Sequence, residues 1–136
     1  MDAKDVATEY MTAISEQRFE RLAELVHPDA TFSGTVKQES RGRDAFVQGF
    51  RHRAPILTRI DMRDVVAEHD RAFVLYDFVT DTAAGGVLCG ELLRVEGGVI
   101  RSSTLIFDWR RWPEVISELQ SRTATEPTKR ERVSVR

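Results

Sequence analysis

Cysteine is nearly absent from this chain of 136 residues, in which Cys89 is the single example. One cysteine cannot form an internal disulfide, and it cannot supply a cysteine-rich metal site. Cys89 lies in an apolar stretch that is typical of a strand, so we expect a buried, inert thiol. The cysteine content therefore supports neither a disulfide-bonded domain nor a thiolate metal centre.

Long hydrophobic runs are also lacking. The apolar segment between Arg71 and Asp81 is interrupted by Asp77, and it is far shorter than the roughly 20 residues that a membrane-spanning helix needs. Residues 1–10 lack the basic segment and the apolar stretch that are typical of an export signal. We therefore expect a cytoplasmic protein with no membrane partner.

Strong charge of either sign is missing as well, because the net charge is −2 and the basic residues are spread along the chain. A nucleic-acid partner is therefore not expected. The one basic cluster, formed by Arg51, His52 and Arg53, is interpreted as the solvated end of a helix, where positive charge suits the helix dipole.

Cofactor-binding patterns are not evident either. His27, His52 and His69 fall in separate predicted elements without the spacing of metal ligands. The glycine pairs at 85–86 and 97–98 separate predicted strands, so they are typical of turns rather than of phosphate-binding loops. We therefore predict no metal and no other cofactor.

The chain does contain a helical first part and a strand-rich second part. Apolar residues recur at helical spacing over 3–14 and 19–26, and again from Gly42 to a stop before Pro55. A short strand is predicted around 30–33, and four antiparallel strands over 59–68, 72–81, 86–96 and 99–109. Pro113 suits the first turn of a last helix. We expect one domain over residues 1–121 and a polar tail over 122–136.

Three segments, in this order of elements, carry a family resemblance: LVHPDATF at 25–32, GRDAF at 42–46 and TLIFDW at 104–109. The chain resembles the nuclear transport factor 2-like superfamily, and most of all its SnoaL-like group of polyketide cyclases and ketosteroid isomerase-like proteins. This resemblance implies an α+β fold, in which a cone-shaped curved antiparallel sheet and N-terminal helices close an internal pocket. It does not select one chemistry, because such folds serve isomerases, cyclases, dehydratases, epoxide hydrolases and proteins that only bind.

The resemblance to ketosteroid isomerase implies roles for particular residues. That enzyme uses an aspartate base and an oxyanion hole made by a tyrosine and a protonated carboxylic acid. Tyr10 matches the tyrosine by its distance from Asp29, and Glu91 matches the acid by its distance from the hairpin at 97–98. The position of the base is Gly34, which cannot accept a proton, so a standard ketosteroid isomerase reaction is not expected.

Glu91 is the residue on which the functional prediction most depends, because it interrupts an apolar strand. An inward carboxyl needs a partner, for which Tyr10 and Tyr76 are candidates, and desolvation then favours its neutral form at pH 7. The alternative is an outward Glu91 at a dimer face or paired with an arginine. Tyr10 in turn has the alternative of a simple packing role.

Two further residues are weaker candidates for proton transfer. His27 is a candidate because histidine is the side chain best suited to proton transfer near neutral pH, but it precedes Pro28, where a helix-ending or turn role is the alternative. Asp108 comes at the end of the last predicted strand. Its side chain either lies at the mouth of the cavity or has a structural role in holding the end of that strand.

Strand alternation predicts the walls of the pocket. The expected lining is largely apolar and consists of Phe32, Phe46, Phe50, Val74, Tyr76, Phe78, Leu93, Ser103, Leu105 and Phe107. Such a cavity suits a small hydrophobic molecule that carries one or two oxygens.

Three functional hypotheses remain open from the sequence. The first is a cofactor-independent isomerase or cyclase that acts on a hydrophobic carbonyl compound by acid–base chemistry. The second is a ligand-binding domain without turnover, and the third is a dimeric interaction module. Because residues 72–79 are apolar on both faces, we also predict a homodimer formed through the outer face of the sheet.

Overall fold

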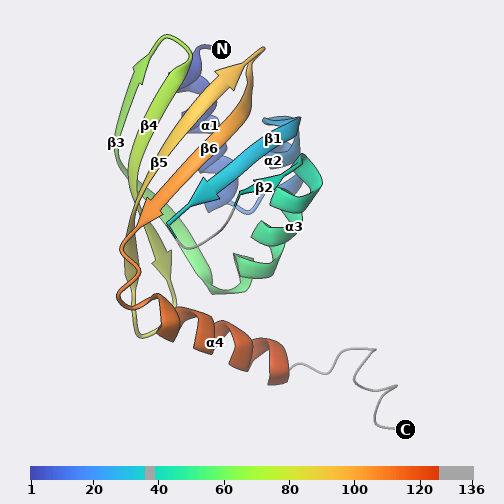
Figure 1. Cartoon of the computed structure of the whole chain (residues 1–136). Coiled ribbons are helices and arrows are strands. Elements are labelled where there is room, and N and C mark those ends of the chain that lie inside the picture. Colours follow the sequence, from blue (N-terminus) through green and yellow to red (C-terminus); the bar gives the residue numbers. More distant parts are fainter. Residues whose placement is uncertain (36–38, 126–136) are drawn as a thin grey trace, which may run out of the picture.

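The computed structural model describes residues 1–35 and 39–125, with side chains up to Arg122. Within these residues the strands form one curved, six-stranded sheet in the order β2-β1-β6-β5-β4-β3, with helices on its concave side (Figure 1). The elements are α1 (Ala3–Ser15), α2 (Phe19–Glu24), β1 (Val26–Gly34), β2 (Ser40–Arg41), α3 (Arg43–Arg53), a 3₁₀ turn (Ala54–Ile56), β3 (Leu57–Glu68), β4 (Arg71–Thr80), β5 (Gly86–Glu96), β6 (Val99–Phe107) and α4 (Trp112–Thr125). The predicted α+β fold is confirmed.

The sheet is mixed rather than wholly antiparallel, which corrects one detail of the prediction. Strand β1 runs parallel to β6, whereas all the other neighbouring pairs are antiparallel. Strand β1 is also longer than predicted, because the chain is already extended at Val26 and the strand passes through Pro28 with a shift of register before Thr31. The short strand β2 was not predicted at all.

Irregular register gives the sheet the curvature that makes room for a cavity. Pairing between β3 and β4 shifts at Leu57/Arg59 and again at Met62/Asp64, and such bulges bend a strand. At the β5–β6 hairpin the expected glycine turn is present. Gly97 and Gly98 have φ of 62° and 81°, so this two-residue turn needs residues that tolerate the left-handed region.

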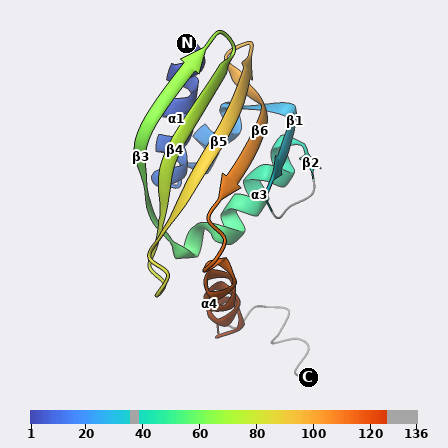
Figure 2. The ribbon, with the colours of Figure 1, turned by 60° about the vertical axis from the view of Figure 1, so that its left-hand side comes forward.

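Helix α1 covers the concave face of the sheet because its apolar stripe is continuous. Val6, Tyr10 and Met11 are among its fully buried residues, and a capping box between Asp2 and Asp5 fixes its start. Helix α3 lies beside β1 and β2, while α4 lies at the lower end of the molecule (Figure 2). The space between these helices and the sheet is where the site forms.

Helix α4 extends beyond the predicted end of the domain. It runs to Thr125, so residues 122–125 are helical rather than part of a tail. Arg122 forms an ion pair with Asp81 at 2.7 Å, which joins the helix to the β4–β5 connection, and a second with Glu118 of the same helix at 3.2 Å. The predicted tail at 126–136 lies outside the described residues. Among the described helices, none has the length and apolarity to cross a membrane.

Candidate functional site

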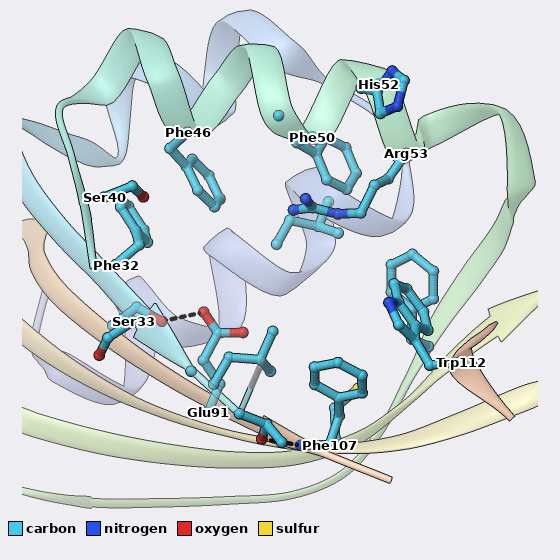
Figure 3. A pocket seen from close by; sticks show the side chains of 18 of the residues that line it. Phe32, Ser33, Ser40, Phe46, Phe50, His52, Arg53, Glu91, Phe107 and Trp112 are labelled. Carbon is cyan, nitrogen blue, oxygen red and sulfur yellow. Dashed lines mark hydrogen bonds between the residues drawn. The ribbon is translucent and has the colours of Figure 1, made fainter. Parts of the chain in front are cut away.

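A cavity of about 340 Å³ lies between the concave face of the sheet and helices α1, α3 and α4. Its volume is near the lower end of the range of about 300–1,000 Å³ that is typical of small-molecule sites. The walls are mainly aromatic and aliphatic, whereas a carboxyl and an arginine are the charged groups in view in Figure 3. The cavity therefore suits a small, mostly apolar molecule with a few polar groups.

Glu91 is the polar centre of this cavity. Its side chain is only 3% exposed, and three hydroxyl groups donate hydrogen bonds to it. Tyr10 Oη and Ser103 Oγ bind Oε2 at 2.8 and 2.6 Å, and Tyr76 Oη binds Oε1 at 2.8 Å. Glu91 therefore faces inward, within hydrogen-bond reach of both tyrosines, as the sequence predicted.

Strand register explains why these groups meet. Glu91 on β5 lies directly opposite Val74 on β4 and Leu105 on β6. Tyr76 and Ser103 are each two residues from those partners, so they lie diagonally across the same face, where long side chains still reach. Tyr10 comes from α1 and closes the network from above the sheet. Donors from α1, β4 and β6 thus hold the carboxyl that β5 carries.

The buried hydrogen-bond network changes the pKa of both tyrosines. Burial raises the pKa of Tyr10 and of Tyr76 well above the ordinary value of 10.0, and the negative charge of Glu91 raises both further. A phenol in this position keeps its proton throughout the neutral range. The two tyrosines are therefore lasting hydrogen-bond donors to Glu91.

Arg53 is the second charged group that lines the cavity. It enters from the last turn of α3 and its guanidinium points toward the interior (Figure 3). Burial lowers the pKa of Arg53, and attraction to Tyr10, Tyr76 and Glu91 partly offsets this effect. An arginine nevertheless stays protonated in proteins, so the cavity holds a permanent positive charge.

Aromatic side chains form the rest of the walls. The rings of Phe32 and Phe46 stack with centroids 4.2 Å apart, and Tyr10 stacks on Phe46 at 6.0 Å. On the opposite side, Phe107 and Trp112 meet edge to face at 5.1 Å. Flat apolar surfaces on two sides favour a flat hydrophobic ligand.

The family model for the SnoaL-like domain matches residues 7–103 of the chain. The chain belongs to the SnoaL-like family. The match spans α1 to Ser103, so it includes every residue of the Glu91 network. No curated protein is significantly similar to this SnoaL-like chain.

Solved structures show the same fold at low sequence identity. A candidate ketosteroid isomerase from Kribbella flavida has a TM-score of 0.70 and 15% identity, covering 78% of this chain and 77% of its own. A candidate polyketide cyclase from Sinorhizobium meliloti has a TM-score of 0.67 and 17% identity over 74% and 93% of the two chains. An LEH-like epoxide hydrolase from M. tuberculosis has a TM-score of 0.69 and 11% identity over 91% and 96%.

Most residues predicted for the site do line the cavity of this SnoaL-like chain. Those in the lining are Tyr10, Phe32, Phe46, Phe50, Tyr76, Phe78, Glu91, Ser103, Leu105 and Phe107. Val74 and Leu93 were also predicted but lie in the packed core, where each is 0% exposed. Both share the inner face of the sheet, yet packed side chains separate them from the open space.

His27 and Asp108, the weaker catalytic candidates, are not part of the lining. His27 lies in β1 rather than at a helix end or turn, and its Nδ1 atom accepts a hydrogen bond from the Asp29 backbone at 2.9 Å. Asp108 is clamped by Arg110, and its hydrogen bonds to that residue lower its pKa to about 2. A carboxyl that stays ionised to such acidity cannot donate protons near neutral pH.

Gly34 does line the cavity, at the position where the resemblance places a catalytic base. A Cβ atom at this residue would overlap the backbone carbonyl oxygen of Leu105 on the neighbouring strand. The close approach of β1 and β6 therefore requires glycine here, and no side chain can reach the cavity from this residue without a shift of backbone.

Sequence reasoning missed Arg53 and the contribution of α4. Arg51 and His52 are exposed as predicted, but Arg53 is partly buried, so the interpretation of all three as a solvated helix end is wrong for Arg53. The helical spacing of Phe46, Phe50 and Arg53 (i, i+4, i+7) was a usable signal for a shared face. Helix α4 adds Trp112, Ile116, Leu119 and Gln120 to the lining.

Metal coordination has no basis in the described part of the chain, where no group of histidine, cysteine and acidic side chains has suitable geometry. Cys89 is buried, and desolvation raises the pKa of its thiol to about 12. Cys89 therefore presents a neutral thiol to the cavity, and this thiol is a poor nucleophile.

Proposed function

We propose that this SnoaL-like protein is a cofactor-independent enzyme that moves a proton on a small hydrophobic carbonyl compound, with Glu91 as the proton acceptor. One observation carries the proposal: a carboxyl is fixed by three hydroxyl donors at the centre of a mainly apolar cavity. Catalytic groups are commonly buried in such clefts with specific partners.

The hydrogen bonds indicate which atom reacts. Oε2 of Glu91 accepts two hydrogen bonds, whereas Oε1 accepts one, from Tyr76. Each carboxylate oxygen has about two lone pairs, so Oε1 keeps one for a substrate. It would take a proton from the carbon next to the carbonyl. The C–H electron pair then forms the enolate, and the proton returns to the same or to a conjugated carbon.

The three hydroxyl groups donate to Glu91, so Glu91 serves in our proposal as an acceptor and not as the hydrogen-bond donor that the resemblance implies. Tyr10 therefore donates to Glu91 instead of lying beside it as a second oxyanion donor. The roles of this pair differ in our proposal from those implied by ketosteroid isomerase.

Hydrogen–deuterium exchange tests the proposal without knowledge of the natural substrate. Aromatic and alicyclic ketones are incubated with the protein in heavy water, and NMR follows deuterium entry next to the carbonyl. We expect exchange well above the buffer rate with the wild type. Substitution Glu91→Gln is expected to remove it, because an amide cannot take the proton; general bases contribute on the order of 100- to 10,000-fold.

The matched control is Asp108→Asn, which removes another carboxylate, paired with Arg110 and outside the cavity lining. Exchange by this variant is expected to equal that of the wild type. Exchange that persists in Glu91→Gln, or that falls equally in both variants, would refute the role of Glu91.

A second candidate function, ligand binding without turnover, has its own support. The base position carries Gly34, and among the described residues each fully buried side-chain polar atom has a hydrogen-bond partner, so Glu91 is also satisfied as a structural group. Ketones that shift the melting temperature but show no exchange would favour this function.

We also propose that the protein is a homodimer formed through the outer face of the sheet. Val66, Phe73, Leu88, Leu92 and Ile106 are exposed large hydrophobic residues on this face, and Ile106 is 56% exposed. Phe73 and Ile106 meet over Gly90, where a Cβ would clash with the ring, so these apolar side chains form a continuous surface. Patches of this kind mark interaction sites.

A further inference from the structure

Arg53 carries a charge that the described residues leave without a direct partner. Across 1–35 and 39–122, Arg53 makes neither a hydrogen bond nor an ion pair, and it acts on Glu91 and the two tyrosines only through space. By contrast, Arg43 on the same helix donates to the Val26 carbonyl, and Arg51 lies over the Phe19 ring at 4.3 Å. Arg53 is thus the arginine of α3 that is turned into the cavity unpaired.

Arg53 is half-buried, so in the empty protein its guanidinium gives up part of its hydration without gaining a direct acceptor from the described residues. A partial loss of hydration of this kind is unfavourable. The surroundings of Arg53 in the cavity include Phe46 and Phe50 of α3, which offer no acceptor (Figure 3). Residues that oppose stability in this way are typical of binding sites, where a ligand supplies the missing partner.

We propose that Arg53 binds a carboxylate of the ligand, so that the natural ligand of this cavity is a hydrophobic carboxylic acid. The planar guanidinium presents paired N–H donors that match a carboxylate, and a charge-assisted pair of this kind is strongest where water is excluded. This inference rests on the proposed function for the identity of the site, and it adds the chemical class of the ligand.

The position of Glu91 determines how such an acid is oriented. Two carboxylates cannot share one end of a cavity without repulsion, so the acid group lies at Arg53 and the neutral end of the ligand lies at Glu91. The stacked pair Phe32 and Phe46 flanks the space between these ends. A reacting carbonyl in the neutral end would therefore be held against Oε1 of Glu91.

A purely structural explanation makes a different prediction. If Arg53 only balances the charge of Glu91 across the cavity, its removal weakens the fold and affects acidic and neutral ligands alike. If it binds a ligand carboxylate, its removal affects acids alone and does not weaken the empty protein.

The experiment compares phenylacetic, naphthoic and indoleacetic acids with their primary amides, using calorimetry or thermal shift near neutral pH. The proteins are the wild type, Arg53→Met and the control Arg71→Met, which removes an exposed arginine at the start of β4, outside the cavity lining. We expect the acids to bind the wild type more tightly than their amides. Arg53→Met is expected to weaken the acids by about 10- to 100-fold, whereas Arg71→Met is expected to change neither class.

The remaining outcomes separate the two proposals. Amides that bind as well as acids, or equal weakening of both classes by Arg53→Met, would overturn the role of Arg53 while leaving the cavity as a ligand site. Failure of every acid and amide to bind the wild type would overturn this proposal, and the ketone exchange experiment would then decide the proposed function by itself.

Stability supplies an independent readout. The melting temperature of unliganded Arg53→Met is expected to equal or exceed that of the wild type, because a half-buried charge without a direct partner among the described residues is removed. Arg53→Lys keeps the charge but loses the paired donors, so it is expected to recover only part of the affinity for acids. A clear fall in the melting temperature of Arg53→Met would support the structural explanation and count against ours.

Discussion

Gly34 and Leu105 approach each other across the parallel β1–β6 pair so closely that residue 34 has no room for a Cβ atom. Restoring the base of ketosteroid isomerase by Gly34→Asp is therefore expected to fail. We expect the variant to lose about 1–3 kcal/mol of unfolding free energy from overpacking, measured by urea denaturation.

The control for this prediction is Gly49→Ala on α3. A Cβ at residue 49 meets Arg53 Nη1 at 3.8 Å, which is ordinary contact, and alanine favours a helix by about 1 kcal/mol over glycine. This variant is expected to be as stable as the wild type or more stable. A stable Gly34→Asp with isomerase activity would show that β1 and β6 separate more readily than we infer.

Glu91 has a structural role besides the chemical role that we propose, and two substitutions separate them. Glu91→Gln keeps an acceptor and a donor for the hydroxyl network, so we expect a loss of only about 1 kcal/mol. Glu91→Leu leaves the hydroxyls of Tyr10, Tyr76 and Ser103 without their acceptor. Because an unsatisfied buried polar group costs about 1–3 kcal/mol, Leu is expected to be clearly the worse of the two in chemical denaturation. Equal stability of the two variants would mean that water replaces the carboxyl.

Alkaline pH is expected to unfold the protein through the site. The chain has two tyrosines, and burial raises the pKa of both Tyr10 and Tyr76. Above the ordinary value of 10.0, the unfolded chain releases phenol protons that the folded chain retains. The stability from this source is thus fully present below that pH and falls as pH rises beyond it.

This behaviour has a direct spectroscopic measure. Tyrosinate absorbance in an alkaline titration is expected to rise together with the loss of circular dichroism, since neither phenol ionises while buried. A tyrosinate signal near the ordinary pKa in a fully folded protein would show that the hydroxyl network opens without unfolding.

The outer face of the sheet gives a prediction about assembly. Ile106→Arg places a charge within the exposed apolar patch, so we expect it to convert a dimer into a monomer, as measured by light scattering at micromolar concentration. The control is Gln48→Arg, which adds the same charge at an exposed position of α3 and is expected to leave the dimer intact. A wild type that is already monomeric would contradict the proposal.

The helices and strands whose position follows from the periodicity of their own residues were predictable from the sequence. Alternation in β5 placed Glu91 on the inner face, and the turn at Gly97 and Gly98 fixed its register with β6. Tyr76 on β4 was named as a partner of Glu91, whereas Ser103 on β6 was predicted only as a wall residue and is also a hydrogen-bond donor to Glu91. The helical stripe of α1 likewise placed Tyr10 inward.

Features that depend on contacts between distant segments were not predictable from local pattern. The alternation of apolar residues in β1 and β6 does not indicate that these strands pair in parallel. This pairing is what excludes a side chain at residue 34. The approach of α4 to the cavity is likewise set by long-range contacts, such as the ion pair of Arg122 with Asp81. Arg53 was different, since its helical spacing from Phe46 and Phe50 was sufficient to place it.

The family match ends at Ser103, which is also the last residue along the chain to bind Glu91. The segments that follow supply Leu105, Phe107, Trp112 and Ile116, which are wall and rim residues. The Glu91 network and Arg53 therefore lie within the family match, whereas one part of the cavity wall lies beyond it. Replacing residues 104–125 by the matching segment of a relative would reshape that part of the wall and keep both charged groups, so the shape of the cavity can diverge separately from its charges.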